Sequence, residues 1–273
     1  MGPLRGARRA GRRRARPSQG RRGGRGRAII LYFSATGNCK HVAKRIAKAT
    51  GDKAVSIEGL DPHITLADGE ALGFVSPTYA WELPTPVSAF LGRLDAEAPA
   101  SPTRSSWPRT TPRPGARTPW RRRWSGSSLR AVRCGVLRAH AGHLDAHLRP
   151  VGSRKGRRDG RRRGPLIDDV IGKVVARESG DWCGPRTPRI AAPAMHLHHL
   201  SMRRTSHFTV DETCIGCGLC AKRCPAQAIE MRNGMPTWAK ESCFACLRCL
   251  HSCPKFAIQY GRNTRAHGQY RHP

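Results

Sequence analysis

Two cysteine runs decide how the C-terminal part of this chain folds: "CIGCGLCAKRCP" at residues 214–225 and "CFACLRCLHSCP" at residues 243–254. Both have the spacing C-x2-C-x2-C-x3-C-P, and they align at an offset of 29 residues. The alignment continues past the prolines, where "AI" recurs at 228–229 and 257–258. Closely spaced thiols in such a pattern indicate metal binding, and the offset indicates a duplicated unit.

This spacing resembles that of bacterial ferredoxins, in which the fourth Cys of each run ligates the cluster of the other run. The resemblance implies two [4Fe–4S] clusters, one held by Cys214, Cys217, Cys220 and Cys253, the other by Cys243, Cys246, Cys249 and Cys224. Zinc is the alternative, because paired cysteines also bind that ion. Two zinc sites would not require three close thiols plus a distant Cys-Pro in each repeat.

The predicted cluster domain, residues 208–262, is a small α+β unit of the bacterial 2[4Fe–4S] ferredoxin kind. We expect "FTV" at 208–210 and "AIQY" at 257–260 to pair as strands, and Ile215, Ile229, Leu247 and Ile258 to shield the clusters. So short a chain buries little apolar surface, so we expect the clusters to be necessary for its folding.

The whole chain has 273 residues, 11 cysteines and a formal net charge of +32. Residues 1–27 contain 11 Arg and no acidic residue, and residues 101–164 contain 18 Lys or Arg and two Asp, so these segments account for +27 of the charge. No apolar stretch follows the basic N-terminus, and "AIILYF" at 28–33 is too short to span a bilayer. We therefore expect no membrane span and a reducing compartment, the cytoplasm.

The two basic segments have neither helical nor strand periodicity. We interpret residues 101–164 as GC-rich DNA translated in the wrong frame, since a shift of two bases over 102–115 permits an apolar strand followed by a Gly-rich loop. Residues 1–27 are interpreted as a disordered Arg-rich leader or as the product of a start codon placed too far upstream. The alternative is that both are disordered, basic, RNA-binding tails.

The N-terminal half alternates strands and helices. "AIILYF" is an apolar strand, "SATGN" is a loop, and "CKHVAKRIAKATG" at 39–51 is a helix that ends at Gly51. A second unit follows, with a strand at 72–75, the loop "SPTYAWELP" at 76–84 and an amphipathic helix containing Val87, Phe90, Leu91 and Leu94. This order predicts a doubly wound parallel sheet, with both loops beyond the carboxyl ends of the strands.

The loops resemble the flavodoxin-like half of the EFR-type flavodoxin–ferredoxin fusion family. The resemblance implies an α/β flavodoxin-like fold over residues 28–180 that binds FMN. The phosphate would lie on Ser34, Ala35, Thr36, Gly37, Asn38 and Cys39, and the ring would be flanked by Pro77, Thr78, Tyr79 and Trp81. Cys39 departs from the family, which favours a hydroxyl residue there. The family's third flavin-binding loop resembles the sequence that the shifted reading frame would encode at 102–115. The chain as translated lacks this loop.

Residues 165–182 are predicted to form the last helix of this domain, with Leu166, Val170 and Val174 on one face. In the linker, residues 181–207, the stretch "HLHH" at 196–199 is either a metal site or part of a linker helix that docks on the next domain. A polar tail occupies 263–273. Basic residues near the clusters could form a docking rim for an acidic partner: Lys222, Arg223, Lys240, Arg248 and Lys255.

These features together predict an electron-transfer protein that carries two [4Fe–4S] clusters and FMN and that exchanges electrons with redox protein partners. No residue is assigned as acid, base or nucleophile, so we expect an electron carrier rather than an enzyme with a dedicated substrate. Two alternatives remain: a basic nucleic-acid-binding protein with structural metal sites, and a flavin oxidoreductase with its own substrate. We expect no specific nucleic-acid partner.

Overall fold

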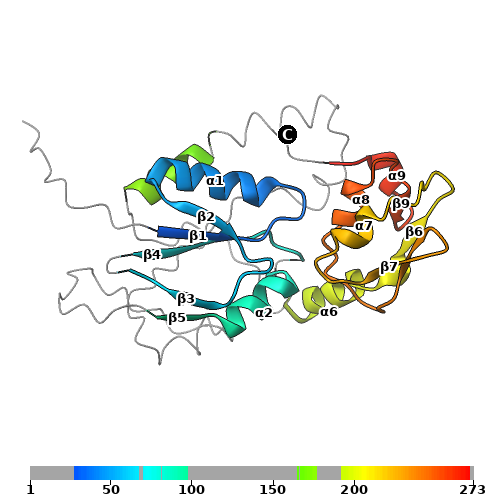
Figure 1. Ribbon diagram of the computed structural model, residues 1–273, viewed down its shortest axis with the longest axis horizontal. Coiled ribbons are helices and arrows are strands. Elements are labelled where there is room, and N and C mark those ends of the chain that lie inside the picture. The colour runs from blue at the N-terminus through cyan, green and yellow to red at the C-terminus, as the bar shows by residue number, and fades with distance from the viewer. Residues whose placement is uncertain are drawn as a thin grey trace, which may run out of the picture.

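The computed structural model describes residues 28–67, 70–80, 82–97, 165, 167–176 and 192–270. The expectations for residues 1–27 and 101–164, for Trp81 and for Leu166 lie outside these ranges. The described residues form an N-terminal α/β half and a C-terminal half made of short strands and helices (Figure 1).

The N-terminal half is built on a parallel sheet of three strands in the order β2-β1-β4. These strands are β1 (Ala28–Tyr32), β2 (Lys53–Ser56) and β4 (Ala71–Val75). Two further strands, β3 (His63–Thr65) and β5 (Asp95–Glu97), pair with each other in parallel. The sheet reverses its winding direction at β1, which places the loop after β1 at the position where such sheets bind ligands.

The central strand β1 faces a helix layer on each side. Ile30 packs with α1, whereas Leu31 and the following Phe33 pack with α2, as the two-residue period of a strand requires. The first helix, α1 (Asn38–Thr50), buries Ala43, Ile46 and Ala47, and the second, α2 (Thr85–Arg93), buries Val87 and Phe90. The doubly wound parallel sheet predicted from the sequence is therefore confirmed.

Three local predictions in this half can be compared with the structure. Gly51 ends α1 in the left-handed conformation, with φ 79°, as predicted. Leu94 lies just beyond the end of α2, in extended conformation, and so is not part of the predicted helical face. Residues 167–175 are helical, and Ile171 and Val174 pack against the α1 side of the sheet, where Arg45 also pairs with Asp168.

The C-terminal half begins with α6 (Ala192–Met202) and a short 3-10 helix, η2 (Thr205–His207). The remaining elements are β6 (Phe208–Val210), α7 (Leu219–Lys222), β7 (Ile229–Arg232), β8 (Met235–Trp238), α8 (Arg248–Ser252), β9 (Ile258–Tyr260) and α9 (Thr264–His267). β6 and β9 pair, as predicted, and their pairing is antiparallel; β7 and β8 form a second antiparallel pair.

The duplication in the sequence is also visible in the backbone. Three positions with positive φ recur at the 29-residue offset: Gly216 and Ala245, Gly218 and Leu247, and Gln227 and Phe256. In the sequence alignment, α7 and α8 begin at equivalent positions, Leu219 and Arg248. The two repeats therefore share one backbone path, although glycine in the first is replaced by larger residues in the second.

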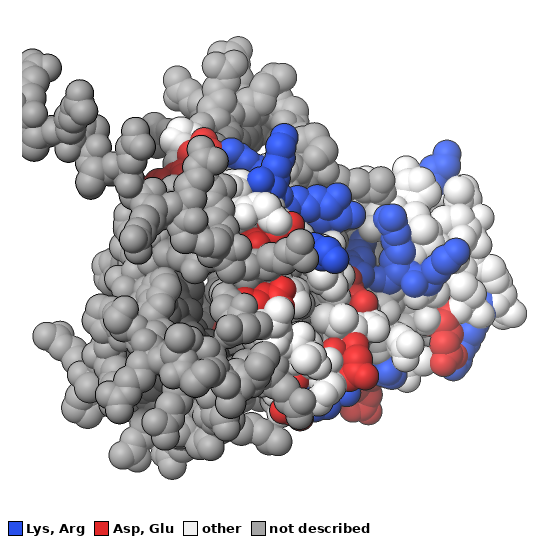
Figure 2. Space-filling model, turned by 60° about the vertical axis from the view of Figure 1, so that its left-hand side comes forward, with Lys and Arg blue, Asp and Glu red and all other residues white. Residues whose placement is uncertain are grey.

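Figure 1 shows that the loops after β1 and β4 face the C-terminal half. Exposed basic side chains occur on α1, at Lys40, Lys44 and Lys48, and beside the cysteine runs, at Lys222, Arg223 and Lys255. Figure 2 shows Lys and Arg side chains gathered in a band across one face of the molecule. None of the helices in the described ranges is long and apolar enough to cross a membrane.

Candidate metal and cofactor sites

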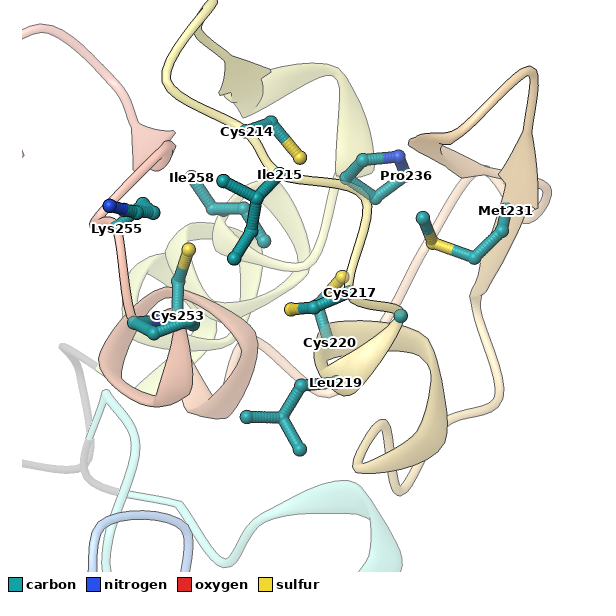
Figure 3. A pocket seen from close by; sticks show the side chains of 12 residues that line it. Cys214, Ile215, Cys217, Leu219, Cys220, Met231, Pro236, Cys253, Lys255 and Ile258 are labelled. Carbon is teal, nitrogen blue, oxygen red and sulfur yellow. The ribbon is translucent and has the colours of Figure 1, made fainter.

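Four of the predicted cluster ligands line a single pocket in the C-terminal half (Figure 3). They are Cys214, Cys217, Cys220 and Cys253, three from the first repeat and the last from the second. The rest of the wall is mainly apolar, with Ile215, Leu219, Met231, Pro236 and Ile258 among its residues. Thiols within an apolar wall are the environment in which proteins hold iron–sulfur clusters.

Local backbone structure brings these thiols together. Cys214 and Cys217 lie in the loop after β6, and left-handed Gly218 begins the single turn of α7 that carries Cys220. Cys253 follows α8 directly, and its sulfur accepts a hydrogen bond from the backbone N–H of Ala257 at 3.3 Å. Because the repeats pack against each other, the last Cys of one lies opposite the first three of the other.

The other four cysteines form a second group. Burial is the main cause that raises the pKa of Cys246 to about 12, and the nearby Cys243 and Cys224 contribute in the same direction. Burial also raises the pKa values of Cys249 and Cys243, with contributions from the same neighbours. Each of the three thiols from the second repeat thus interacts with Cys224 of the first, which is the crosswise grouping that the sequence predicts.

Backbone N–H groups point at sulfur in this group as well. The N–H of Ala228 donates to Cys224 Sγ at 3.4 Å, and the N–H of Ala245 donates to Cys243 Sγ at 3.3 Å. The Ala228 bond is the repeat-related counterpart of the bond from Ala257 to Cys253. Such donors stabilise a thiolate and adjust the potential of a cluster bound to it.

The donor set and its arrangement fit a cluster better than single ions. All nine cysteines in the described ranges are free thiols. Across those ranges, no group of three or more His, Cys, Asp or Glu occurs that could hold a metal ion. In a cubane each thiolate binds a different iron atom, so its four sulfur ligands lie farther apart than the ligands of one ion. This arrangement gives no support to the zinc alternative.

One predicted shielding residue is placed differently from the expectation. Ile229 and Ile258 are buried, and Leu247 is partly buried against the same core. Ile215 lines the first pocket but is 59% exposed. The first pocket is therefore open to solvent at Ile215, next to Cys217, which is also exposed.

The predicted phosphate loop joins β1 to the N-terminus of α1. Gly37 has φ 103°, which favours glycine, and its N–H donates to Ser34 Oγ at 3.1 Å. No side chain caps α1, and its first turn contains no acidic residue. Within the described ranges, no hydrogen bond engages the backbone N–H of Thr36 or Cys39. A loop of this kind leaves donors for an anion such as a phosphate group.

The remaining phosphate-loop residues are engaged in other ways. Asn38 Oδ1 accepts a hydrogen bond from Tyr270 Oη at 2.6 Å. Burial raises the pKa of the Cys39 thiol to about 12, so the group is neutral and a weak donor. Ala35, like Ser34 and Thr36, is partly buried in this loop.

The second predicted flavin loop follows β4. Tyr79 and Glu82 exchange backbone hydrogen bonds of 2.9 and 2.8 Å, which closes a tight turn in which Ala80 has φ 44°. Tyr79 and Pro77 are partly buried, whereas Thr78 is exposed. Burial raises the pKa of Tyr79, and Cys246 and Cys39 raise it further. Tyr79 thus lies near the second thiol group and near the phosphate loop.

Contacts between the two halves involve Glu58 and Glu82, which were not among the predicted site residues, and Arg248, which was predicted only as part of a docking rim. Arg248 forms an ion pair with Glu58 and donates from Nη2 to the carbonyl oxygen of Ser34. His196 and His199 of α6 contact the carboxylate of Glu82 at 3.0 and 2.8 Å. The "HLHH" stretch is therefore part of a docked linker helix, and two of its imidazoles pair with a carboxylate.

The polar C-terminal tail, predicted at 263–273, makes specific contacts with α8 and with the phosphate loop. Gln269 Nε2 donates to the carbonyl oxygens of Leu250 and Cys253 at 2.7 and 2.6 Å, and Tyr270 reaches Asn38. No local signal in the sequence identifies these contacts, because they join residues of ordinary polarity that are far apart in the chain.

Comparison with known protein families gives two matches. Residues 29–104 match the model of a flavodoxin domain, and residues 202–260 match that of a 4Fe-4S dicluster domain. No curated protein and no solved structure matches the chain. The fold is thus a flavodoxin domain with a parallel sheet, followed by a small ferredoxin-type domain with short antiparallel sheets. This combination supports iron–sulfur and flavin cofactors and a role in electron transfer.

Proposed function

We propose that this protein is a cytoplasmic electron carrier that holds two [4Fe–4S] clusters and one FMN and passes electrons between redox protein partners. The observation that supports it most strongly is the crosswise grouping of eight thiols beside two loops of flavin-binding character. The first cluster belongs to Cys214, Cys217, Cys220 and Cys253, and the second to Cys243, Cys246, Cys249 and Cys224.

FMN is assigned to the loops after β1 and β4. The backbone at 34–39 would bind the phosphate, and residues 77–81 would flank the ring. When bound, the clusters supply one-electron steps, and the flavin converts between one-electron and two-electron steps. The chain itself orients the groups and limits water around the thiols. The buried thiols must lose protons to bind iron, so cluster assembly is accompanied by proton release.

The partner is expected to be an acidic redox protein. Lys255 lines the first pocket, and Lys222 and Arg223 are exposed nearby. Opposite charges speed the encounter of two proteins and orient them, and the effect weakens as salt rises. The segments that favour the nucleic-acid alternative lie outside the described residues, so no observation advances that function.

Anaerobic reconstitution of single-cysteine variants tests the proposal. The wild-type chain should contain about eight iron atoms, the content of two cubanes. Cys253→Ala should lose the same cluster signal in EPR as Cys214→Ala, although Cys253 belongs to the second repeat. Cys39→Ser is the matched control, because Cys39 lies outside both thiol groups, and it should retain all the iron.

Two results would contradict the proposal. A folded wild-type chain with eight intact thiols and no cluster signal would remove it altogether. Loss of the same cluster in Cys253→Ala and Cys243→Ala would show that each repeat holds its own cluster, which would overturn the crosswise ligand assignment.

A further inference from the structure

Arg248 is the residue of the C-terminal half that makes the most polar contacts with the N-terminal half. Its Nη1 lies 2.8 Å from Glu58 Oε1, and its Nη2 lies 3.0 Å from Glu58 Oε2, a two-pronged ion pair. Nη2 also donates to the carbonyl oxygen of Ser34 at 2.8 Å. The Arg248 side chain is only 14% exposed and the Glu58 side chain is 34% exposed, so the pair is partly shielded from solvent.

The position of Arg248 within its repeat connects these contacts to the second thiol group. Arg248 is the first residue of α8 and lies in the sequence between Cys246 and Cys249. Its guanidinium carbon lies 5.8 Å from the ring centroid of Phe33, the residue before the phosphate loop. One side chain therefore spans from the second thiol group to the start of the flavin loop.

The first repeat has no equivalent of this contact. The residue aligned with Arg248 is Leu219, which lines the first pocket and carries no charge. The two repeats thus differ at the position that determines which of them can pair with Glu58. The pseudo-symmetry of the cluster domain alone would let either repeat face the flavin loops, and the guanidinium favours the second.

A second observation gives the same orientation. The N–H of Tyr270 donates to Nδ1 of His251 in α8 at 3.1 Å, and its Oη donates to Asn38 Oδ1 in the phosphate loop at 2.6 Å, so the second repeat also contacts this loop through Tyr270. Within the described ranges, no hydrogen bond or ion pair joins the thiols of the first pocket to the flavin loops, and that pocket is open to solvent at Ile215.

We propose that Arg248 is the positioning residue that docks the cluster of Cys224, Cys243, Cys246 and Cys249 against the flavin loops. That cluster is then the one that exchanges electrons with the flavin. The cluster of Cys214, Cys217, Cys220 and Cys253 is the one that receives electrons from a reduced redox protein. This inference rests on the proposed function, because it assumes that both clusters and the flavin are bound.

The electron balance is simple, because no atom is transferred between the centres. Each step oxidises a cluster by one electron and reduces the flavin by one, and two such steps complete its reduction. Solvent supplies the protons that the reduced flavin takes up. The reductant is a reduced acidic redox protein in the proposed function, and dithionite replaces it in the test.

The test uses the reconstituted full chain, four variants at charged residues, and Cys246→Ala as a blank for direct flavin reduction. Arg248→Ala removes the contact from the cluster domain, and Glu58→Gln weakens it from the flavodoxin domain without altering the cluster domain. Arg232→Ala is the matched control, because Arg232 also pairs with a glutamate, Glu230 at 3.0 Å, but both side chains are exposed and lie away from the flavodoxin domain. The fourth variant is the double variant, Arg248→Ala with Glu58→Gln.

Three measurements are made on each chain: iron and FMN content, amide hydrogen exchange at 34–39, and the rate of flavin reduction by the clusters after rapid mixing with dithionite. The rate at which dithionite reduces the flavin directly is measured in Cys246→Ala, which lacks the cluster of Cys224, Cys243, Cys246 and Cys249, and is subtracted from each rate. We expect Arg248→Ala to retain both cofactors, to exchange faster at 34–39 and to reduce its flavin at least about 10-fold more slowly. That factor corresponds to about 1.4 kcal/mol of docking free energy.

Glu58→Gln should also speed amide exchange at 34–39 and slow flavin reduction. The double variant should show no larger effect than Arg248→Ala, because both changes remove the same interaction. Arg232→Ala should match the wild type. Wild-type rates in both Arg248→Ala and Glu58→Gln, with the cofactors retained, would overturn the inference and leave the proposed function standing. A wild-type chain that binds neither cluster nor flavin would overturn both.

Discussion

Replacing Gly216 with alanine tests how closely the first cysteine loop approaches its neighbour. Gly216 has φ 65°, and a Cβ built there would lie 2.8 Å from the carbonyl oxygen of Gly234. Gly234 lies in the two-residue turn between β7 and β8, so the backbone hydrogen bonds of that hairpin hold this oxygen in place. The alanine must therefore displace the loop that carries Cys214 and Cys217.

The magnitude follows from two contributions. A left-handed conformation costs a residue with a Cβ about 1–2 kcal/mol. Overpacking against fixed atoms adds about 1–3 kcal/mol, so the expected loss for Gly216→Ala is roughly 2–5 kcal/mol. Gly218 supplies the matched control: its φ is 67°, but a Cβ there meets only the flexible Met231 side chain, at 3.9 Å. Gly218→Ala should lose only about 1–2 kcal/mol.

Anaerobic guanidinium unfolding of the reconstituted chain measures both variants, with iron content as a second reading. Gly216→Ala should unfold at lower denaturant than Gly218→Ala and should lose the first cluster selectively. Equal losses in the two variants would refute the argument, because they differ only in the contact with Gly234. The aligned position in the second repeat is Ala245, with φ 49°, which shows that the conformation itself accepts alanine.

The remaining predictions concern the core and the linker. Leu250 is fully buried, so Leu250→Ala should lower the free energy of unfolding by about 2–5 kcal/mol, whereas the control Leu197→Ala, 66% exposed, should change it little. Partial burial of Glu82 opposes its ionisation, but hydrogen bonds from His199 and His196 outweigh this effect and lower its pKa. The resulting stability is present above pH 4.5 and is lost as the pH falls through the lowered pKa. The difference in thermal unfolding between wild type and Glu82→Gln should therefore shrink below pH 4.5, and a constant difference from pH 6 to pH 4 would count against this pairing.

The N-terminal sheet was predictable because its signals are local. A continuous apolar run gives β1, and Gly51 ends α1 because only glycine adopts its φ of 79° without strain. The β7–β8 hairpin was not predicted, although Asn233-Gly234 between two short strands is a strong turn signal. Both strands have only four residues, so the alternation that marks a strand in the sequence is too short to identify them.

The grouping of the cysteines could be predicted from their spacing, whereas the contacts between the two domains could not be predicted from the sequence. The spacing grouped Cys253 with the first repeat, and the structure places it in the same pocket, while its role as a ligand stays a prediction. The pair of Arg248 with Glu58 had no signal, because the residues are 190 positions apart and each resembles an ordinary surface charge. Ile215 was expected to shield a cluster, but an apolar residue type does not specify which way a loop turns it.

Separate non-covalent ties join the two halves: Arg248 with Glu58, Tyr270 with Asn38, and the paired imidazoles of α6 with Glu82. None of these groups belongs to residues 177–191, which connect the helix at 167–175, packed on the N-terminal sheet, to α6. A tether between docked partners sets their effective concentration and does not determine how their surfaces fit. Residues altered or inserted at 177–191 should therefore change how often the halves meet, while the contacts that determine the geometry of their encounter lie on either side of that segment.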